Sequence, residues 1–269
     1  MNQVQNDEIR QHVRSRYKQI ALYNENESDA GCCAPAISCC DTPRDFNDIS
    51  SKLGYSNDEL TSVPEGANLG LGCGNPQAIA SLQAGEVVVD LGSGGGFDSF
   101  LAAKQVGDSG KVIGVDMTPE MISRARGNAL RGGYANTEFR LGEIEHLPIS
   151  DDSVNVIISN CVINLSPDKQ QVFNEAIRVL KPGGRLAISD IVTTAALPEE
   201  IKQDMDSLAG CISGASSIDE IQIILEDSGF VDIVIEPKDE SKAFIRKWIP
   251  GAQVDQYIVS AVIKAAKAL

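Results

Sequence analysis

The sequence predicts an α/β fold built around a mostly parallel sheet, and two observations carry this prediction. The first is a run of β-branched residues at 87–89 that leads directly into a glycine-rich loop, as expected of a parallel strand buried on both faces. The second is a regular alternation of apolar strands and helices after that loop. The strands are expected at 111–116, 138–141, 154–159 and 185–190, and the helices at 97–105, 118–130 and 168–180.

The loop after the first strand predicts a cofactor site. Gly92, Gly94 and Gly96 follow Asp90 in G-x-G-x-G spacing, and no Gly-Lys-Ser/Thr for a nucleotide phosphate is present. An acid directly before the loop suits a cofactor with an amino acid end better than a pyrophosphate. The next strand ends at Asp116, where a carboxylate can accept hydrogen bonds from a ribose diol. The alternatives are a nicotinamide fingerprint, a phosphate loop or an ordinary glycine-rich turn in another doubly wound protein.

With Asp116 and the β-α series that follows, this loop resembles that of the class I S-adenosylmethionine (SAM)-dependent methyltransferases. The resemblance implies a Rossmann-like, mostly parallel seven-stranded sheet whose last strand is antiparallel, and 231–236 and 256–263 fit its final strands. It also implies where the cofactor binds: the loop holds the methionine end, Asp116 the ribose, and the segments after the second and third strands the adenine. The candidate cofactor residues are Asp90, Gly92, Ser93, Gly94, Gly96, Asp116, Met117, Glu143, Ile144 and Asn160.

Composition narrows the range of partners. The chain has 269 residues and a formal charge of −15, which is unfavourable for holding nucleic acid phosphates, so we expect a small substrate and no nucleic acid. We expect no membrane contact, because no apolar run is long enough to cross a bilayer. The first ten residues do not read as a targeting peptide, so we expect a cytoplasmic protein. Seven cysteines in such a chain indicate thiols used for metal or redox chemistry.

Three of these cysteines lie in segments that the fold brings near the cofactor. Cys73 lies among glycines before an expected helix, where Asn75 can cap and Pro76 suits the first turn, so we expect the helix end to lower the pKa of Cys73. Cys161 follows the strand at 154–159, and Cys211 lies in a loop of small residues. Each alone could be a small buried hydrophobic residue, but together they form a candidate site.

The other four cysteines, Cys32, Cys33, Cys39 and Cys40, form two vicinal pairs in an expected loop. Their spacing does not match the C-x-x-C of structural zinc sites. Three interpretations stay open: a closed zinc site, thiols without a role, and thiol exchange on a mobile loop.

The chemistry of three converging thiols points to a soft ion. Histidine is sparse, with only His12 and His146, and neither lies in a cofactor or cysteine segment. Three thiolates can hold a trigonal pyramidal ion that keeps a lone pair, and trivalent arsenic has that geometry. Such an ion can itself attack a methyl sulfonium, so the reaction requires no general base.

Several segments together resemble the arsenite methyltransferases: 72–76 (GCGNP), 159–165 (SNCVINL), 189–190 with 197–200 (SD, LPEE) and 210–214 (GCISG). The resemblance extends to about residue 230. It implies that Cys161 and Cys211 hold arsenic, that Cys73 is a further ligand and redox partner, and that Cys32 or Cys33 pairs with Cys73 as a disulfide. It further implies SAM as methyl donor, arsenite presented as a thiol conjugate, arsenic detoxification, and thioredoxin or glutathione as reductant. The alternatives are a methyltransferase for another small molecule and a thiol-based arsenite sensor.

The expected organisation has three parts. Residues 1–77 form an N-terminal extension, with an amphipathic helix at 7–23 followed by the cysteine-rich loop. This helix either packs on the main domain or helps to close the cofactor site. Residues 78–192 form the SAM-binding domain, and residues 193–269 carry the Cys211 loop and the last strands as a substrate-binding addition.

Overall fold

The computed structural model describes residues 3–22, 45–202, 204–248 and 252–269. Its centre is a sheet with the strand order β3-β2-β1-β4-β5-β8-β7, in which β8 runs antiparallel to both of its neighbours. The expected α/β fold with an antiparallel last strand is confirmed, and a two-residue strand, β6, pairs with β5 as an eighth member. The strands are β1 (Val87–Leu91), β2 (Lys111–Asp116), β3 (Thr137–Leu141), β4 (Val154–Asn160), β5 (Leu180–Thr193), β6 (Ser216–Ser217), β7 (Phe230–Lys238) and β8 (Ile258–Lys267).

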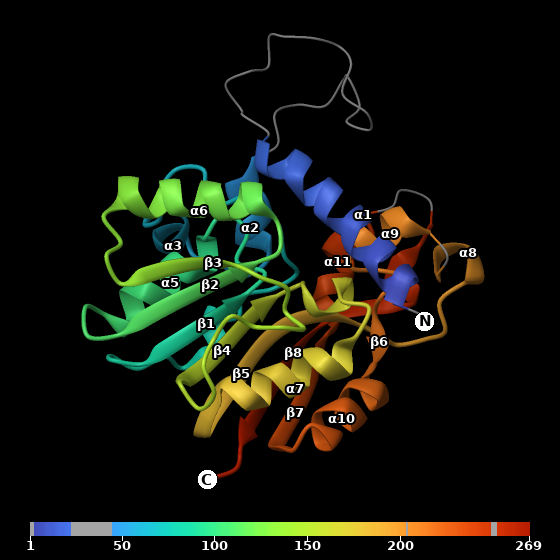
Figure 1. The fold of residues 1–269 in the computed structure, drawn as a ribbon. Coiled ribbons are helices and arrows are strands. Elements are labelled where there is room, and N and C mark those ends of the chain that lie inside the picture. Colours follow the sequence, from blue (N-terminus) through green and yellow to red (C-terminus); the bar gives the residue numbers. More distant parts are fainter. Residues whose placement is uncertain (1–2, 23–44, 203, 249–251) are drawn as a thin grey trace.

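Helices cover both faces of this sheet (Figure 1). Alternate residues of the buried strands enter two different apolar clusters, because side chains point to opposite faces along a strand. Val88 and Val112 pack with α5 on one face, and Val89 and Ile113 pack with α7 and α10 on the other. The helices that follow these strands are α5 (Phe97–Val106), α6 (Pro119–Gly132), α7 (Lys169–Val179) and α10 (Ile218–Asp227).

Local signals set most element ends, with two departures from expectation. Pro119 opens α6 after Thr118, as predicted, although the Thr118 side chain makes no capping hydrogen bond. The segment Lys181-Pro182-Gly183-Gly184 ends α7 as predicted, but it belongs to β5, which starts at Leu180 rather than at residue 185. The reason is tertiary, because Leu180 pairs with Val154 of β4 before an irregularity in the ladder.

Several of the remaining helices lie at the carboxyl ends of the parallel strands. The N-terminal helix α1 starts earlier than expected and crosses this end of the molecule beside α9 (Figure 1). The chain between β7 and β8 returns to the same end through α11. Within the described residues, no helix has the length and apolar character needed to cross a membrane. The remaining helices are α1 (Gln3–Leu22), α2 (Phe46–Lys52), α3 (Asn57–Thr61), α4 (Gln77–Ala80), η2 (Ile163–Leu165), α8 (Glu199–Lys202), α9 (Met205–Ala209), η3 (Asp239–Ser241), α11 (Lys242–Ile245) and η4 (Val254–Gln256).

Candidate active site

One large cavity of about 1130 Å³ lies at the carboxyl ends of β1, β2 and β4. Ligands of open α/β sheets bind at this edge. Its wall includes Gly92 and Asp116 from the predicted cofactor segments and Cys161 and Cys211 from the predicted thiol segments. Expected cofactor residues and expected arsenic ligands therefore face the same space.

The glycine loop shapes the cofactor side of this cavity. Gly92 and Gly94 both have positive φ angles, 67° and 50°, and a Cβ on Gly94 would meet no atom within 4 Å. The Ser93 hydroxyl is buried and has no hydrogen-bond partner within the described part of the chain. Open space above one glycine and an unpaired donor beside it fit a polar ligand such as the methionine end of SAM.

Asp116 closes the loop from the second strand. Its carboxylate accepts the Gly94 N–H at 3.0 Å and the Thr118 N–H at 2.8 Å, so it fixes the loop as well as facing the cavity. Burial raises the pKa of Asp116, against the effect of these two hydrogen bonds. Met117 and Ile144, the expected neighbours of adenine, also line the cavity.

Four predicted cofactor residues do not line it. Asp90 is 3% exposed and accepts the Ser99 hydroxyl at 2.6 Å, while a Cβ on Gly96 would press into Phe100. Both positions shape the strand-to-helix turn beneath the loop. Ser93 is buried within the loop, and Glu143 points to α1, where it pairs with Arg10 and Arg14. The direct cofactor contacts assigned to these residues remain predictions.

Asn160 ties the cofactor side to the cysteine side. Its Oδ1 accepts the Cys73 N–H at 3.0 Å, and its Nδ2 donates to the Gly74 carbonyl at 2.8 Å. The same Nδ2 group reaches Tyr55 and Asp98, which are themselves joined by a hydrogen bond of 2.7 Å. Asn160 thus holds the Cys73 segment against the end of β4 while lining the cavity.

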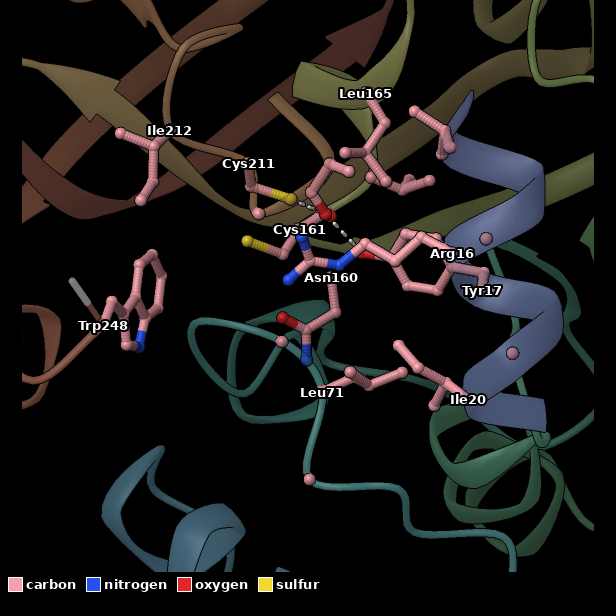
Figure 2. Close-up of a pocket in the computed structure, with 18 of the residues that line it drawn as sticks. Arg16, Tyr17, Ile20, Leu71, Asn160, Cys161, Leu165, Cys211, Ile212 and Trp248 are labelled. Atoms are coloured by element: carbon pink, nitrogen blue, oxygen red, sulfur yellow. Dashed lines mark hydrogen bonds between the residues drawn. The ribbon is translucent and has the colours of Figure 1, made fainter. Parts of the chain in front are cut away.

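Two of the three described thiols line the cavity, and the third lies behind them. Figure 2 shows the sulfur atoms of Cys161 and Cys211 between α1 and Trp248. Both cysteines have positive φ angles, 59° and 64°, which are uncommon for residues with a Cβ and favour functional positions. The Cys211 thiol donates to the Cys161 carbonyl at 2.8 Å. Cys73 is 2% exposed and does not line the cavity.

The expected low pKa of Cys73 is wrong. Burial raises the pKa of this thiol, and the neighbouring Asp190 raises it further. The helix that follows, α4, has only four residues, so its end cannot offset the desolvation. The pKa of Cys161 is also raised well above its ordinary value, by its hydrogen bonds with the Cys211 and Cys73 thiols and by burial.

A buried carboxylate completes this cluster. One ligand atom each of Cys73, Cys161 and Asp190 lie within 4.8 Å of one another. Asp190 accepts the Ile163 N–H at 2.9 Å and the Asn164 side-chain amide at 2.9 Å. It therefore anchors the turn that follows Cys161. The upstream thiols Cys32, Cys33, Cys39 and Cys40 lie outside the described residues.

Comparison with known proteins places this geometry in a family. A family model described as a methyltransferase domain matches residues 82–229. An arsenite methyltransferase from Halobacterium salinarum is 50% identical over 97% of this chain and 67% of its own length. The chain belongs to the arsenite methyltransferase family. An arsenite methyltransferase from Aquipseudomonas alcaligenes is 40% identical over 77% of this chain and 59% of its own, so the chain spans only part of each of these two relatives.

A solved member of the arsenite methyltransferase family has the same fold. The arsenic(III) SAM methyltransferase from Chlamydomonas reinhardtii superposes with a TM-score of 0.61, at 32% identity, over 82% of this chain and 73% of that one. A Haemonchus contortus phosphoethanolamine N-methyltransferase reaches the same TM-score at 19% identity, which shows the shared fold alone. The predicted SAM-dependent methyltransferase fold and the predicted family are confirmed.

Several side chains that line the cavity were not among the predicted site residues, and Glu145, Tyr17 and Trp248 are three of them. Glu145, rather than Glu143, is the acid on the wall after β3, and its side chain is 4% exposed. No local pattern separates the two acids, because Glu143 and Glu145 both flank the apolar Ile144. Tyr17 on α1 and Trp248 after α11 form opposite walls (Figure 2). The apolar spacing of α1 indicates Tyr17, but no local signal indicates Trp248.

Proposed function

We propose that this chain transfers a methyl group from SAM to trivalent arsenic held by Cys161 and Cys211. The observation that carries the proposal is that these two thiols share one cavity with the glycine loop and Asp116. SAM would supply the methyl group as an electrophilic sulfonium. Gly92, Gly94 and Asp116 would hold its amino acid and ribose parts, and Met117 and Ile144 its base.

The substrate would enter by thiol exchange. Arsenite conjugated to small thiols gives up two of them, each leaving with the proton of the cysteine that replaces it. The exchange is balanced in protons, and the attacking species is the thiolate, whose share is small for Cys161 because the pKa of its thiol is raised. The lone pair that remains on arsenic then forms the bond to the methyl carbon while the donor carbon–sulfur bond breaks. The rate enhancement would come mainly from holding the two reactants in line.

Methyl transfer raises arsenic from the trivalent to the pentavalent state, so two electrons must return. We propose that Cys73 supplies them together with Cys32 or Cys33, forming a disulfide. Thioredoxin or glutathione would then reduce that disulfide. The position of Cys73 behind Cys161, off the cavity wall, suits a redox partner better than a permanent arsenic ligand. A reducing cytoplasm and a role in arsenic detoxification belong to the same proposal.

The proposal is tested by incubating the protein with methyl-labelled SAM, arsenite and excess small thiol, followed by separation of the arsenic species. We expect labelled methylarsenicals with the unaltered chain, and none with Cys161→Ser or Cys211→Ser. Cys73→Ser should still bind arsenite but should stop turning over. Arsenite binding without any labelled product in the unaltered chain would contradict the proposal and favour a sensor. Label on another acceptor would point to a different small-molecule substrate.

A further inference from the structure

The helix α1 forms a wall that the cofactor side and the thiol side of the cavity share. Arg10, Val13 and Tyr17 all line the cavity. Val13 has no exposed surface and packs in one apolar cluster with Cys161 and Cys211. The helix also packs against α6 on the cofactor side and against α9 on the thiol side.

On the cofactor side, Arg10 holds Glu145. The Arg10 guanidinium donates to Oε1 of Glu145 through Nη2 at 3.0 Å and through Nε at 3.3 Å, and the Ser166 hydroxyl donates to the same oxygen at 2.8 Å. No described side chain or backbone group donates to Oε2 of Glu145. Arg10 therefore occupies Oε1 of the Glu145 carboxylate and leaves Oε2 free to accept a hydrogen bond from a ligand in the cavity. Without the cation, this buried carboxylate would lose its charge partner.

On the thiol side, the next turns of α1 hold the chain that leads to Cys211. Arg16 Nη1 donates to the Asp206 carbonyl at 3.1 Å, and the Tyr17 hydroxyl donates to the Ala209 carbonyl at 3.4 Å. Both carbonyls belong to α9, and Ala209 is two residues before Cys211. Because the backbone at Cys211 adopts a positive φ, its thiol direction depends on contacts that fix this turn.

We propose that Arg10 and Tyr17 are positioning residues through which α1 couples cofactor binding to arsenite binding. The inference rests on the proposed function, since it takes the two halves of the cavity to be the cofactor and arsenic sites. A ligand that contacts Glu145 stabilises the docked position of α1, and a docked α1 fixes the Cys211 turn. The ligand that binds second then meets a wall already ordered, so each ligand strengthens binding of the other.

The coupling is measured with S-adenosylhomocysteine, which cannot transfer a methyl group, and arsenite in small thiol. Trp248, the single tryptophan of the chain, lines the cavity, so its fluorescence should respond to arsenite binding. Titration calorimetry reports binding of S-adenosylhomocysteine. We expect each ligand to raise the affinity for the other by the same coupling factor, about tenfold. The factor should fall toward one in Arg10→Met and in Tyr17→Phe, which keeps the ring and removes the hydroxyl.

Gln11→Ala is the matched control. Gln11 is exposed on the same helix, its side-chain amide donates to Asp7 of that helix at 2.7 Å, and it does not line the cavity, so its variant should keep the full factor. Hydrogen exchange gives a second readout, because α1 amides should gain protection when either ligand binds. If Arg10→Met does not fold, Tyr17→Phe alone decides.

Two results would overturn the inference: a factor of one in the unaltered protein, or a factor that is undiminished in the folded variants. Failure of the unaltered protein to bind arsenite at all, with S-adenosylhomocysteine bound, would instead overturn the proposed function. The two failures are therefore distinguishable.

Discussion

Cys161 and Cys211 are held by backbone conformations that a residue with a Cβ rarely adopts, and their neighbours explain how. The turn after Cys161 is fixed by Asp190 through the Ile163 N–H and the Asn164 amide. The loop after Cys211 ends at Gly214, which packs directly on the Asn164 carbonyl. This contact between the two loops therefore contributes to the placement of both thiols.

Gly214→Ala tests this contact. A Cβ at Gly214 would overlap the Asn164 carbonyl oxygen, a backbone atom that cannot swing aside. We expect arsenite affinity to fall tenfold or more by fluorescence titration, while S-adenosylhomocysteine affinity stays within about twofold. Gly127→Ala on α6, where the added Cβ would meet only the end of Arg131 at 3.4 Å, is the control. Equal arsenite affinity in both variants would contradict the role of this contact.

Asp98 makes stability depend on pH. Burial raises its pKa to about 6, against hydrogen bonds from Tyr55 and Asn160. The folded value lies above the unfolded value of about 3.9, so its proton stabilises the folded state fully below pH ~4, and this contribution is lost as the pH rises through about 6.

The urea unfolding free energy of the unaltered protein should therefore fall from pH ~4.5 to pH ~6 by about 1 kcal/mol per pH unit more than that of Asp98→Asn. Asp108→Asn, at an exposed carboxyl before β2, controls for the loss of one acidic group. Parallel slopes for the unaltered chain and Asp98→Asn would show that Asp98 does not hold this proton.

At the scale of elements, the start of α10 contains an interaction that stabilises the fold but lies away from the cavity. The helix α10 begins with a capping box, in which the Ser217 hydroxyl accepts the Glu220 N–H and the Glu220 carboxylate accepts the Ser217 N–H. It packs on β7 and α7, away from the cavity.

Ser217→Ala should lower the free energy of unfolding by about 1 kcal/mol, because it leaves a helix N–H without its acceptor. The KM for arsenite should not change. Ser217→Thr, which keeps a hydroxyl, should retain most of the stability. A changed KM with an unchanged unfolding midpoint would mean that α10 acts on the site instead.

A comparison of the predicted and observed elements shows which features local sequence patterns can predict. The run of valines in β1, the glycines after it and Pro119 before α6 act within a few residues, so the sequence predicts these elements well. The predicted start of β5 was wrong because Leu180 pairs with Val154, and no local pattern indicates that pairing. The cavity wall formed by Trp248 was missed for the same reason, since α11 reaches the site only when β7 and β8 have joined the sheet.

At the scale of the whole molecule, net charge opposes the folded state. The chain has 38 acidic and 23 basic residues, so its like charges repel when the chain is compact. Salt should screen this repulsion, because the Debye length falls from about 30 Å at 0.01 M to about 8 Å at 0.15 M.

We expect the thermal midpoint to rise by about 2–4 °C over that range, which corresponds to roughly 1 kcal/mol. Differential scanning calorimetry in sodium chloride and in potassium chloride separates screening from the binding of a specific ion. A falling midpoint would mean that the surface ion pairs outweigh the net repulsion.

Local sequence patterns were enough to predict the α/β order, the glycine loop, the carboxylate at Asp116 and the segments that carry Cys73, Cys161 and Cys211. These follow from periodicity, backbone freedom at glycine and the polarity of strand ends, all of which act over short distances along the chain. The division at residues 77 and 192 stays a prediction.

Tertiary packing selected which of these groups face the cavity. It turned Glu145 rather than Glu143 toward the cavity and buried Cys73, which raised the pKa of its thiol. It also laid α1 across both halves of the site. Side-chain direction and desolvation depend on neighbours far away in the sequence, and those neighbours are fixed only when the sheet and its covering helices have packed.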